Sequence, residues 1–172
     1  MLLHIWGEKR GRSRRNRGGT RVFHKIFAIV KSVISRYGLL PPEELAGGFN
    51  VVTLDVNTKQ VRGCSMTIAG RRLIALNSSL SNQYRRGVLL HEVGHFLLHP
   101  GVNRFFLERS TFFQPGRYET EADLFALTYL LLWNRDGFEE CGYDVFRFAE
   151  CYGLSRRAAE VVYGEVEKNI FS

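Results

Sequence analysis

Hydrophobic residues recur at helical spacing in several parts of the chain. Each such segment carries apolar side chains on one side and polar ones on the other, which is typical of helices that pack on a core. Gly38 with Pro41 and Pro42 stops the first segment, and Pro100 stops the second. The pattern predicts helices over residues 22–37, 83–98, 117–133, 143–152 and 156–169, and a loop over residues 101–117.

Between the first two helices the period changes to that of β-strands. Three short, β-branched runs, FNVVTLDV, VRGCSMTIA and RRLIAL, follow one another, with turn residues at Asn57 and Gly70. Because short turns join consecutive antiparallel strands, we expect an antiparallel meander. A small antiparallel sheet with helices before and after it places the chain in the α+β class.

Length and composition set the kind of protein. The 172 residues are 45% hydrophobic, which is enough for one core. The three cysteines lack any C-x-x-C pair, and this argues against a disulfide framework or a cysteine-based zinc site. The longest apolar runs are about half of the roughly 20 residues that cross a bilayer, and the N-terminus lacks a signal-like apolar region. We therefore expect a cytoplasmic protein without membrane contact.

The net charge of +7 is concentrated at one end of the chain. Residues 1–21 hold seven basic side chains against Glu8 alone, so they carry +6, and the remaining residues carry only +1. This arm is rich in glycine and arginine, and we expect it to be disordered. Two interpretations stay open for it, a solvated tail or a weak contact with nucleic acid or another acidic partner.

The sequence HEVGH at residues 91–95 is the strongest chemical signal. On a helix His91 and His95 lie one turn apart, at 0° and about 40°, so both imidazoles can converge on one zinc ion while an apolar stripe faces the core. Glu92 is placed to act as general acid and base on a zinc-bound water. The alternative is a buried histidine pair that binds no metal.

A catalytic zinc usually has three protein ligands, and the next helix offers candidates for the third. In YETEADLFALTYLL, Glu119 and Asp123 share one helix face with the small Ala126, and Glu121 points the other way. We predict Glu119 as the third ligand, with Glu121 as the alternative. Asp123 would accept the proton of a ligand imidazole and fix its tautomer.

Two further features near HEVGH leave alternatives open. His99 lies on the same side as His95 at the end of the helix, where it can contact the site or be a surface cation at the helix C-terminus. The loop over 101–117 can pack on the core as a hydrophobic flap or cover the substrate as a lid. Its four phenylalanines are Phe105, Phe106, Phe112 and Phe113.

Three motifs in order, IALNSSLS, HEVGHFLLH and ETEADLFALTYLL, resemble the ImmA/IrrE family of metallopeptidases. The resemblance covers roughly residues 22–165 and implies a compact zincin fold and a zinc-dependent endopeptidase. It also implies limited cleavage of helix-turn-helix repressors that control mobile elements, phage or stress genes. By residue it implies zinc at His91 and His95, the acid/base role at Glu92, and a third ligand in the Glu119 segment. The basic arm is not part of the family pattern.

The C-terminal run FRFAECYGLSRRAAEVV resembles a helix-turn-helix. Residues 143–172 nevertheless hold four basic and five acidic side chains, so we expect packing or protein recognition there rather than DNA binding. The predicted organisation is a basic arm (1–21), a zincin-like core (22–136) and a C-terminal helical segment packed on it (137–172). The alternative function is a non-catalytic regulator that binds a repressor or DNA and uses the core as a scaffold.

Overall fold

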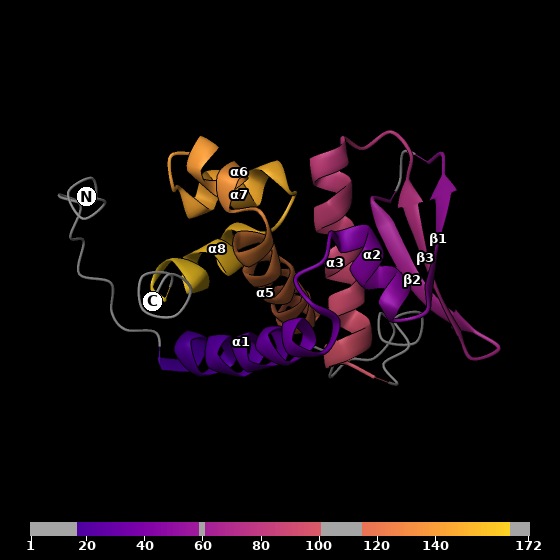
Figure 1. Cartoon of the computed structure of the whole chain (residues 1–172), viewed down its shortest axis with the longest axis horizontal. Coiled ribbons are helices and arrows are strands. Elements are labelled where there is room, and N and C mark those ends of the chain that lie inside the picture. Colours follow the sequence, from indigo (N-terminus) through magenta and orange to yellow (C-terminus); the bar gives the residue numbers. More distant parts are fainter. Residues whose placement is uncertain (1–16, 59–60, 101–114, 166–172) are drawn as a thin grey trace.

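A computed structural model describes residues 17–58, 61–100 and 115–165. Helix α3 (Asn82–Leu98) lies between a small sheet on one side and helix α5 (Pro115–Trp133) on the other (Figure 1). The other helices are α1 (Arg17–Tyr37), α2 (Pro42–Gly48), α6 (Arg135–Glu140), α7 (Val145–Cys151) and α8 (Arg156–Tyr163). This combination of helices with one small sheet confirms the α+β class.

The sheet has three strands, β1 (Val51–Val56), β2 (Gly63–Ile68) and β3 (Arg71–Asn77), in the order β1-β3-β2. β2 and β3 are antiparallel and are joined by Ala69 and Gly70, which both have positive φ angles, as a tight hairpin turn requires. β1 pairs with β3 in parallel. The predicted antiparallel meander is therefore wrong, because only one of the two strand pairs is antiparallel.

Asn77, at the end of β3, contacts the connection between β1 and β2. Its side-chain amide donates to the carbonyl oxygens of Thr58, at 2.5 Å, and Val61, at 3.3 Å. Its backbone N–H donates to the carbonyl of Arg62. These bonds hold the described ends of the connection between β1 and β2 against the end of β3, in keeping with the order β1-β3-β2.

The long helices lie close to their predicted bounds. α3 begins after Ser81, whose hydroxyl accepts from the backbone N–H of Tyr84, in agreement with the predicted capping residues. α1 begins at Arg17, within the segment assigned to the basic arm. α8 ends at Tyr163, with Gly164 as its C-cap, so the predicted helix over 156–169 is too long. The pattern did not predict α2 and α6, which have seven and six residues and are too short to show a helical period.

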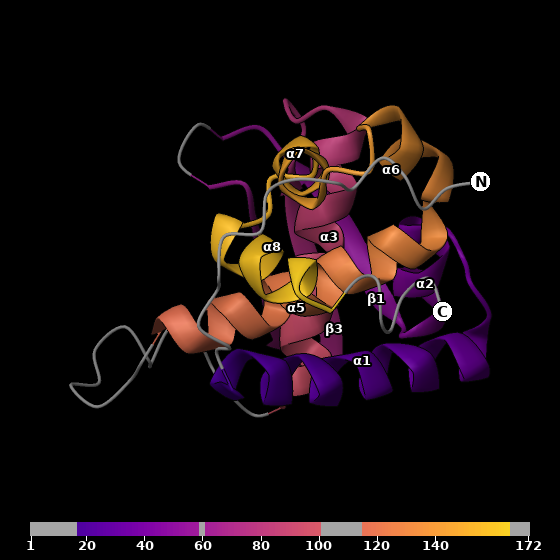
Figure 2. The same ribbon diagram turned by 90° about the vertical axis from the view of Figure 1, so that its left-hand side faces the viewer.

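α3 packs closely on α5 and on the chain that follows α7. A Cβ on Gly94 would lie 3.3 Å from the backbone of Ala122 in α5, and a Cβ on Gly87 would lie 1.9 Å from the carbonyl oxygen of Tyr152, just after α7. α8 packs on α5 and α7, and α1 packs on α5 (Figure 2). The absence of side chains at Gly87 and Gly94 thus lets the sheet, α3 and the C-terminal helices form one core.

The predicted flap or lid with its four phenylalanines falls mainly on residues 101–114, outside the described residues. Residues 115–117, also assigned to that loop, form the first turn of α5. Among the described helices, none has the length and apolar character to span a bilayer.

Candidate metal centre

The two histidines of HEVGH lie on one face of α3, one turn apart. Their ring centroids are 4.7 Å apart, and the two Nε2 atoms approach to 3.0 Å. Val93 and Leu90 on the opposite side of the helix are almost fully buried in the core, and this fixes which way the histidines point. Both imidazoles thus present Nε2 to one place between α3 and α5.

Glu119, in the second turn of α5, reaches the same place. One carboxylate oxygen lies 3.3 Å from Nε2 of His91, and the other lies 3.4 Å from Nε2 of His95. One ligand atom from each of the three residues lies within 4.8 Å of the other two. Two imidazole nitrogens and a carboxylate oxygen are a donor set that catalytic zinc uses, so these residues fit a zinc ion.

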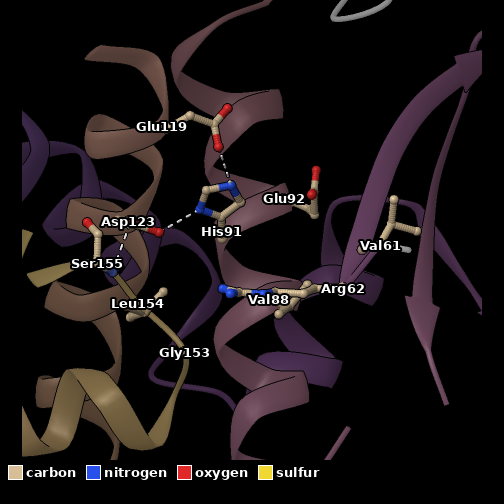
Figure 3. Close-up of a pocket in the computed structure, with 11 residues that line it drawn as sticks. Val61, Arg62, Val88, His91, Glu92, Glu119, Asp123, Gly153, Leu154 and Ser155 are labelled. Atoms are coloured by element: carbon tan, nitrogen blue, oxygen red, sulfur yellow. Dashed lines mark hydrogen bonds and ion pairs between the residues drawn. The ribbon is translucent and has the colours of Figure 1, made fainter. Parts of the chain in front are cut away.

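Asp123 lies one turn further along α5 and contacts the Nδ1 side of the His91 ring, opposite to the cluster (Figure 3). The Nδ1–H of His91 donates to Oδ1 of Asp123 at 2.7 Å, which leaves Nε2 free to face the cluster. Burial disfavours the His91 cation, but hydrogen bonds and charge from Asp123 and Glu119 outweigh burial and raise the pKa of His91 to about 9. A metal ion entering at neutral pH would therefore displace a proton from His91.

Glu92 lies beside His91 on the side that faces the sheet, whereas Glu119 and Asp123 lie on the side of α5 (Figure 3). Its side chain is buried, and its Oε2 accepts a hydrogen bond of 2.6 Å from the Ser65 hydroxyl of β2. Glu92 is not one of the three clustered residues. Its carboxylate thus lies beside the candidate metal position without being one of the clustered groups.

Ser65 is a residue that sequence reasoning missed. It lies 27 positions before Glu92, in a strand whose alternation does not identify the residue facing α3. The backbone N–H of Ser155, which donates to Oδ2 of Asp123 at 3.1 Å, was missed for the same reason. Both contacts depend on how separate elements pack, and no local pattern signals them.

Glu121 and His99 form a second pair away from the cluster. Glu121 accepts a hydrogen bond of 2.9 Å from Arg117, and its other oxygen lies 3.7 Å from Nε2 of His99. The His99 side chain is only 5% exposed and packs against Tyr118, so the surface interpretation of His99 is wrong. Burial lowers the pKa of His99, which disfavours a cation at this helix end. The His99 ring also lies against the His95 ring. A supporting role for His99 at the cluster therefore stays a prediction.

A cleft of about 390 Å³ opens beside the cluster. Its walls come from the start of β2, from α3, from α5 and from the turn at Gly153–Ser155 (Figure 3). His91, Glu92, Glu119 and Asp123 all line it, and Arg62 supplies a positive charge. The candidate acid/base and two of the cluster residues therefore face a space that a bound molecule can enter.

Comparison with known proteins shows to which family the chain belongs. A family model described as peptidase M78, IrrE N-terminal-like domain, matches residues 46–161. The chain belongs to the peptidase M78 family. It is also similar to the uncharacterized immunity region protein 2 of Bacillus phage phi105, at 35% identity over 107 residues, which is 62% of this chain and 68% of that relative. The resemblance to the ImmA/IrrE family is thus confirmed.

The M78 match extends from α2 into α8, so it includes the cluster, Glu92, Ser65 and Asp123. α1 and the basic arm lie outside it. Membership makes this chain a relative of metal-dependent peptidases. The roles of its individual residues stay predictions.

Proposed function

We propose that this chain is a zinc-dependent endopeptidase that makes limited cuts in a regulatory protein, a helix-turn-helix transcriptional repressor. One observation carries the proposal: His91, His95 and Glu119 converge, and a buried Glu92 lies beside them outside the cluster. A hydrolytic zinc site needs this division, because the ligands hold the ion and a separate carboxylate moves the proton. Membership of the peptidase M78 family supports the same chemistry.

The chain's own residues would divide the work of peptide hydrolysis. Zinc held by His91, His95 and Glu119 would supply a Lewis acid that polarises the peptide carbonyl and lowers the pKa of a bound water toward 7. Glu92 would take a proton from that water as its oxygen bonds to the carbonyl carbon. Glu92 would then give the proton to the amide nitrogen as the C–N bond breaks. The Ser65 hydroxyl would orient Glu92 for both transfers.

The choice of a repressor as substrate rests on the relatives. One relative is named as an immunity region protein of a phage. The resemblance to the ImmA/IrrE family implies helix-turn-helix repressors as substrates. The open cleft beside Glu92 supports a protein segment as the bound molecule. A partner repressor would therefore present an exposed segment to this cleft.

The test combines metal analysis with cleavage of a candidate repressor. We expect about one zinc per chain, lost in His91→Ala and in His95→Ala. Glu92→Gln should keep the zinc and the fold but cleave at least about 10²-fold more slowly. Glu44→Gln, an exposed carboxylate on α2, removes the same charge and should cleave normally.

Three outcomes would overturn the proposal. Full zinc content in both histidine variants would place the metal elsewhere. A Glu92→Gln variant that binds zinc and still cleaves at the normal rate would refute the acid/base role. Zinc binding with stoichiometric capture of the intact repressor, unchanged in Glu92→Gln, would favour the non-catalytic regulator instead.

A further inference from the structure

The exposed face of α1 carries only positive charge. Arg21, Lys25, Lys31 and Arg36 are all exposed, and at about 100° per residue they lie within an arc of about 140°. The rest of that arc holds small residues, serines and His24, whose Nε2 lies 3.8 Å from a carboxylate oxygen of Glu165. α1 itself has no acidic residue. In the described part of the chain, no carboxylate lies within ion-pair distance of these four cations.

The positive charge of the whole chain is also concentrated in its N-terminal part. Residues 1–37 hold ten lysines and arginines against Glu8, so they carry +9. The remaining 135 residues hold 14 basic and 16 acidic side chains, so they carry −2. The positive charge of the protein thus comes entirely from α1 and the segment before it, which lie outside the M78 match.

We propose that the exposed face of α1 is a surface that binds the phosphate backbone of duplex DNA. A helix of 21 residues is about 31 Å long, close to one turn of B-DNA, so its cations can meet several phosphates. Contacts to phosphate carry no sequence information, so we expect the binding to be independent of sequence.

The packing of α1 argues against the other anionic partners. A helix that lies on a membrane inserts an apolar face, but the apolar face of α1, with Phe23, Ile26 and Val30, is fully buried against the protein core. A protein interface is anchored by aromatic and other large apolar residues, and the exposed arc of α1 has none. The exposed arc of α1 can therefore recognise a partner through positive charge only. A nucleic-acid phosphate backbone is a partner that binds through charge in this way.

This surface is separate from the candidate metal centre. No residue of α1 lines the cleft, and Figure 2 shows α1 along one edge of the molecule, beside α5 and α8. The inference does not depend on zinc or on proteolysis. If the proposed function holds, the surface would keep the peptidase close to DNA, where a repressor substrate is bound.

The experiment compares two triple variants of equal net charge in the full-length protein. One replaces Arg21, Lys25 and Lys31 of α1 by Gln. The matched control replaces the exposed Arg147, Arg156 and Arg157 of α7 and α8 by Gln, on the segment that resembles a helix-turn-helix. Binding to a fluorescent duplex of arbitrary sequence is titrated between about 50 and 200 mM salt, and thermal unfolding confirms that both variants are folded.

We expect the α1 variant to bind at least about tenfold more weakly at low salt. The slope of log affinity against log salt should fall by about 2 to 3, close to 0.9 for each lost phosphate contact. The control should change the affinity less than about twofold. Glu92→Gln should bind DNA like the unmodified protein, which separates this inference from the proposed function.

Four results would overturn the inference. The unmodified protein could show no duplex binding at low salt. The two variants could weaken binding equally, which would indicate net charge alone. The control could weaken binding more, which would place the contact on α7 and α8. Tighter binding to vesicles rich in anionic lipid than to the duplex would identify a membrane surface instead.

Discussion

Asp123 joins the candidate metal centre to the C-terminal helices. One of its oxygens accepts from Nδ1 of His91, and the other accepts from the backbone N–H of Ser155, which caps α8. The same carboxylate thus orients a candidate ligand and holds the turn that forms one wall of the cleft. This links the segment that resembles a helix-turn-helix to the chemistry of the cluster.

Asp123→Ala should weaken zinc binding by about 10- to 100-fold, because the His91 ring would lose the partner that fixes its orientation. Glu119→Ala should lower the zinc affinity further than Asp123→Ala does, because it removes a candidate ligand. Glu121→Ala should do little, since Glu121 contacts Arg117 and His99 and not the cluster. Competition with a chromophoric chelator measures all three affinities, and a larger loss in Glu121→Ala than in Glu119→Ala would refute the assignment of the third ligand.

Ser65 is a positioning residue for Glu92, because its hydroxyl donates to the carboxylate proposed to move the proton. A hydrogen bond to a charged group contributes about 1.5–3 kcal/mol, so Ser65→Ala should lower kcat by roughly tenfold or more and leave KM and zinc content nearly unchanged. Ser65→Thr keeps a hydroxyl and should restore most of kcat. An effect of Ser65→Ala on KM alone would show that Ser65 contacts substrate instead.

Among the elements, α3 holds His91, Glu92 and His95 of the candidate metal centre and also packs closely on its neighbours. The histidine face of α3 could be predicted from sequence, because the period of 3.6 residues places His91 and His95 together. The same period places Glu119 and Asp123 on one face of α5. The contact made by Gly87 could not be predicted, because it depends on where the chain after α7 returns. The strand order escaped prediction for a similar reason, since the Asn77 side chain binds backbone of the crossover and leaves no periodic signal.

Gly87→Ala tests the packing of α3 against the C-terminal segment. The new Cβ would lie 1.9 Å from the backbone oxygen of Tyr152, so one of the two segments must move. We expect a loss of about 1–3 kcal/mol in unfolding free energy, typical of an overpacked core, in urea denaturation. Gly47→Ala in α2 is the matched control, since open space surrounds it and alanine favours the helix by up to about 1 kcal/mol. Equal stability of the two variants would contradict the close contact.

At the scale of the whole molecule, the candidate metal centre lies at the junction of two long helices. His91 and His95 come from α3 and Glu119 from α5, and α3 also packs on the sheet. A metal ion bound there would connect the two halves of the core, so its binding would add to the free energy of unfolding. The unfolded chain does not hold the three candidate ligands together, since 24 residues separate Glu119 from His95.

Zinc should therefore raise the unfolding temperature of the metal-free protein. At about 1,000 times the dissociation constant, the linkage contributes about 4 kcal/mol, and for a chain of this length each kcal/mol shifts Tm by roughly 2–4 °C. We expect a rise of about 10 °C in a thermal scan of the chelator-treated protein after zinc is added. Glu92→Gln should show the full rise, because Glu92 lies outside the cluster, and Glu119→Ala should show little of it. If Glu92→Gln lost the rise and Glu119→Ala kept it, the ligand and the acid/base would have to be exchanged, and the division of roles between α3 and α5 would be wrong.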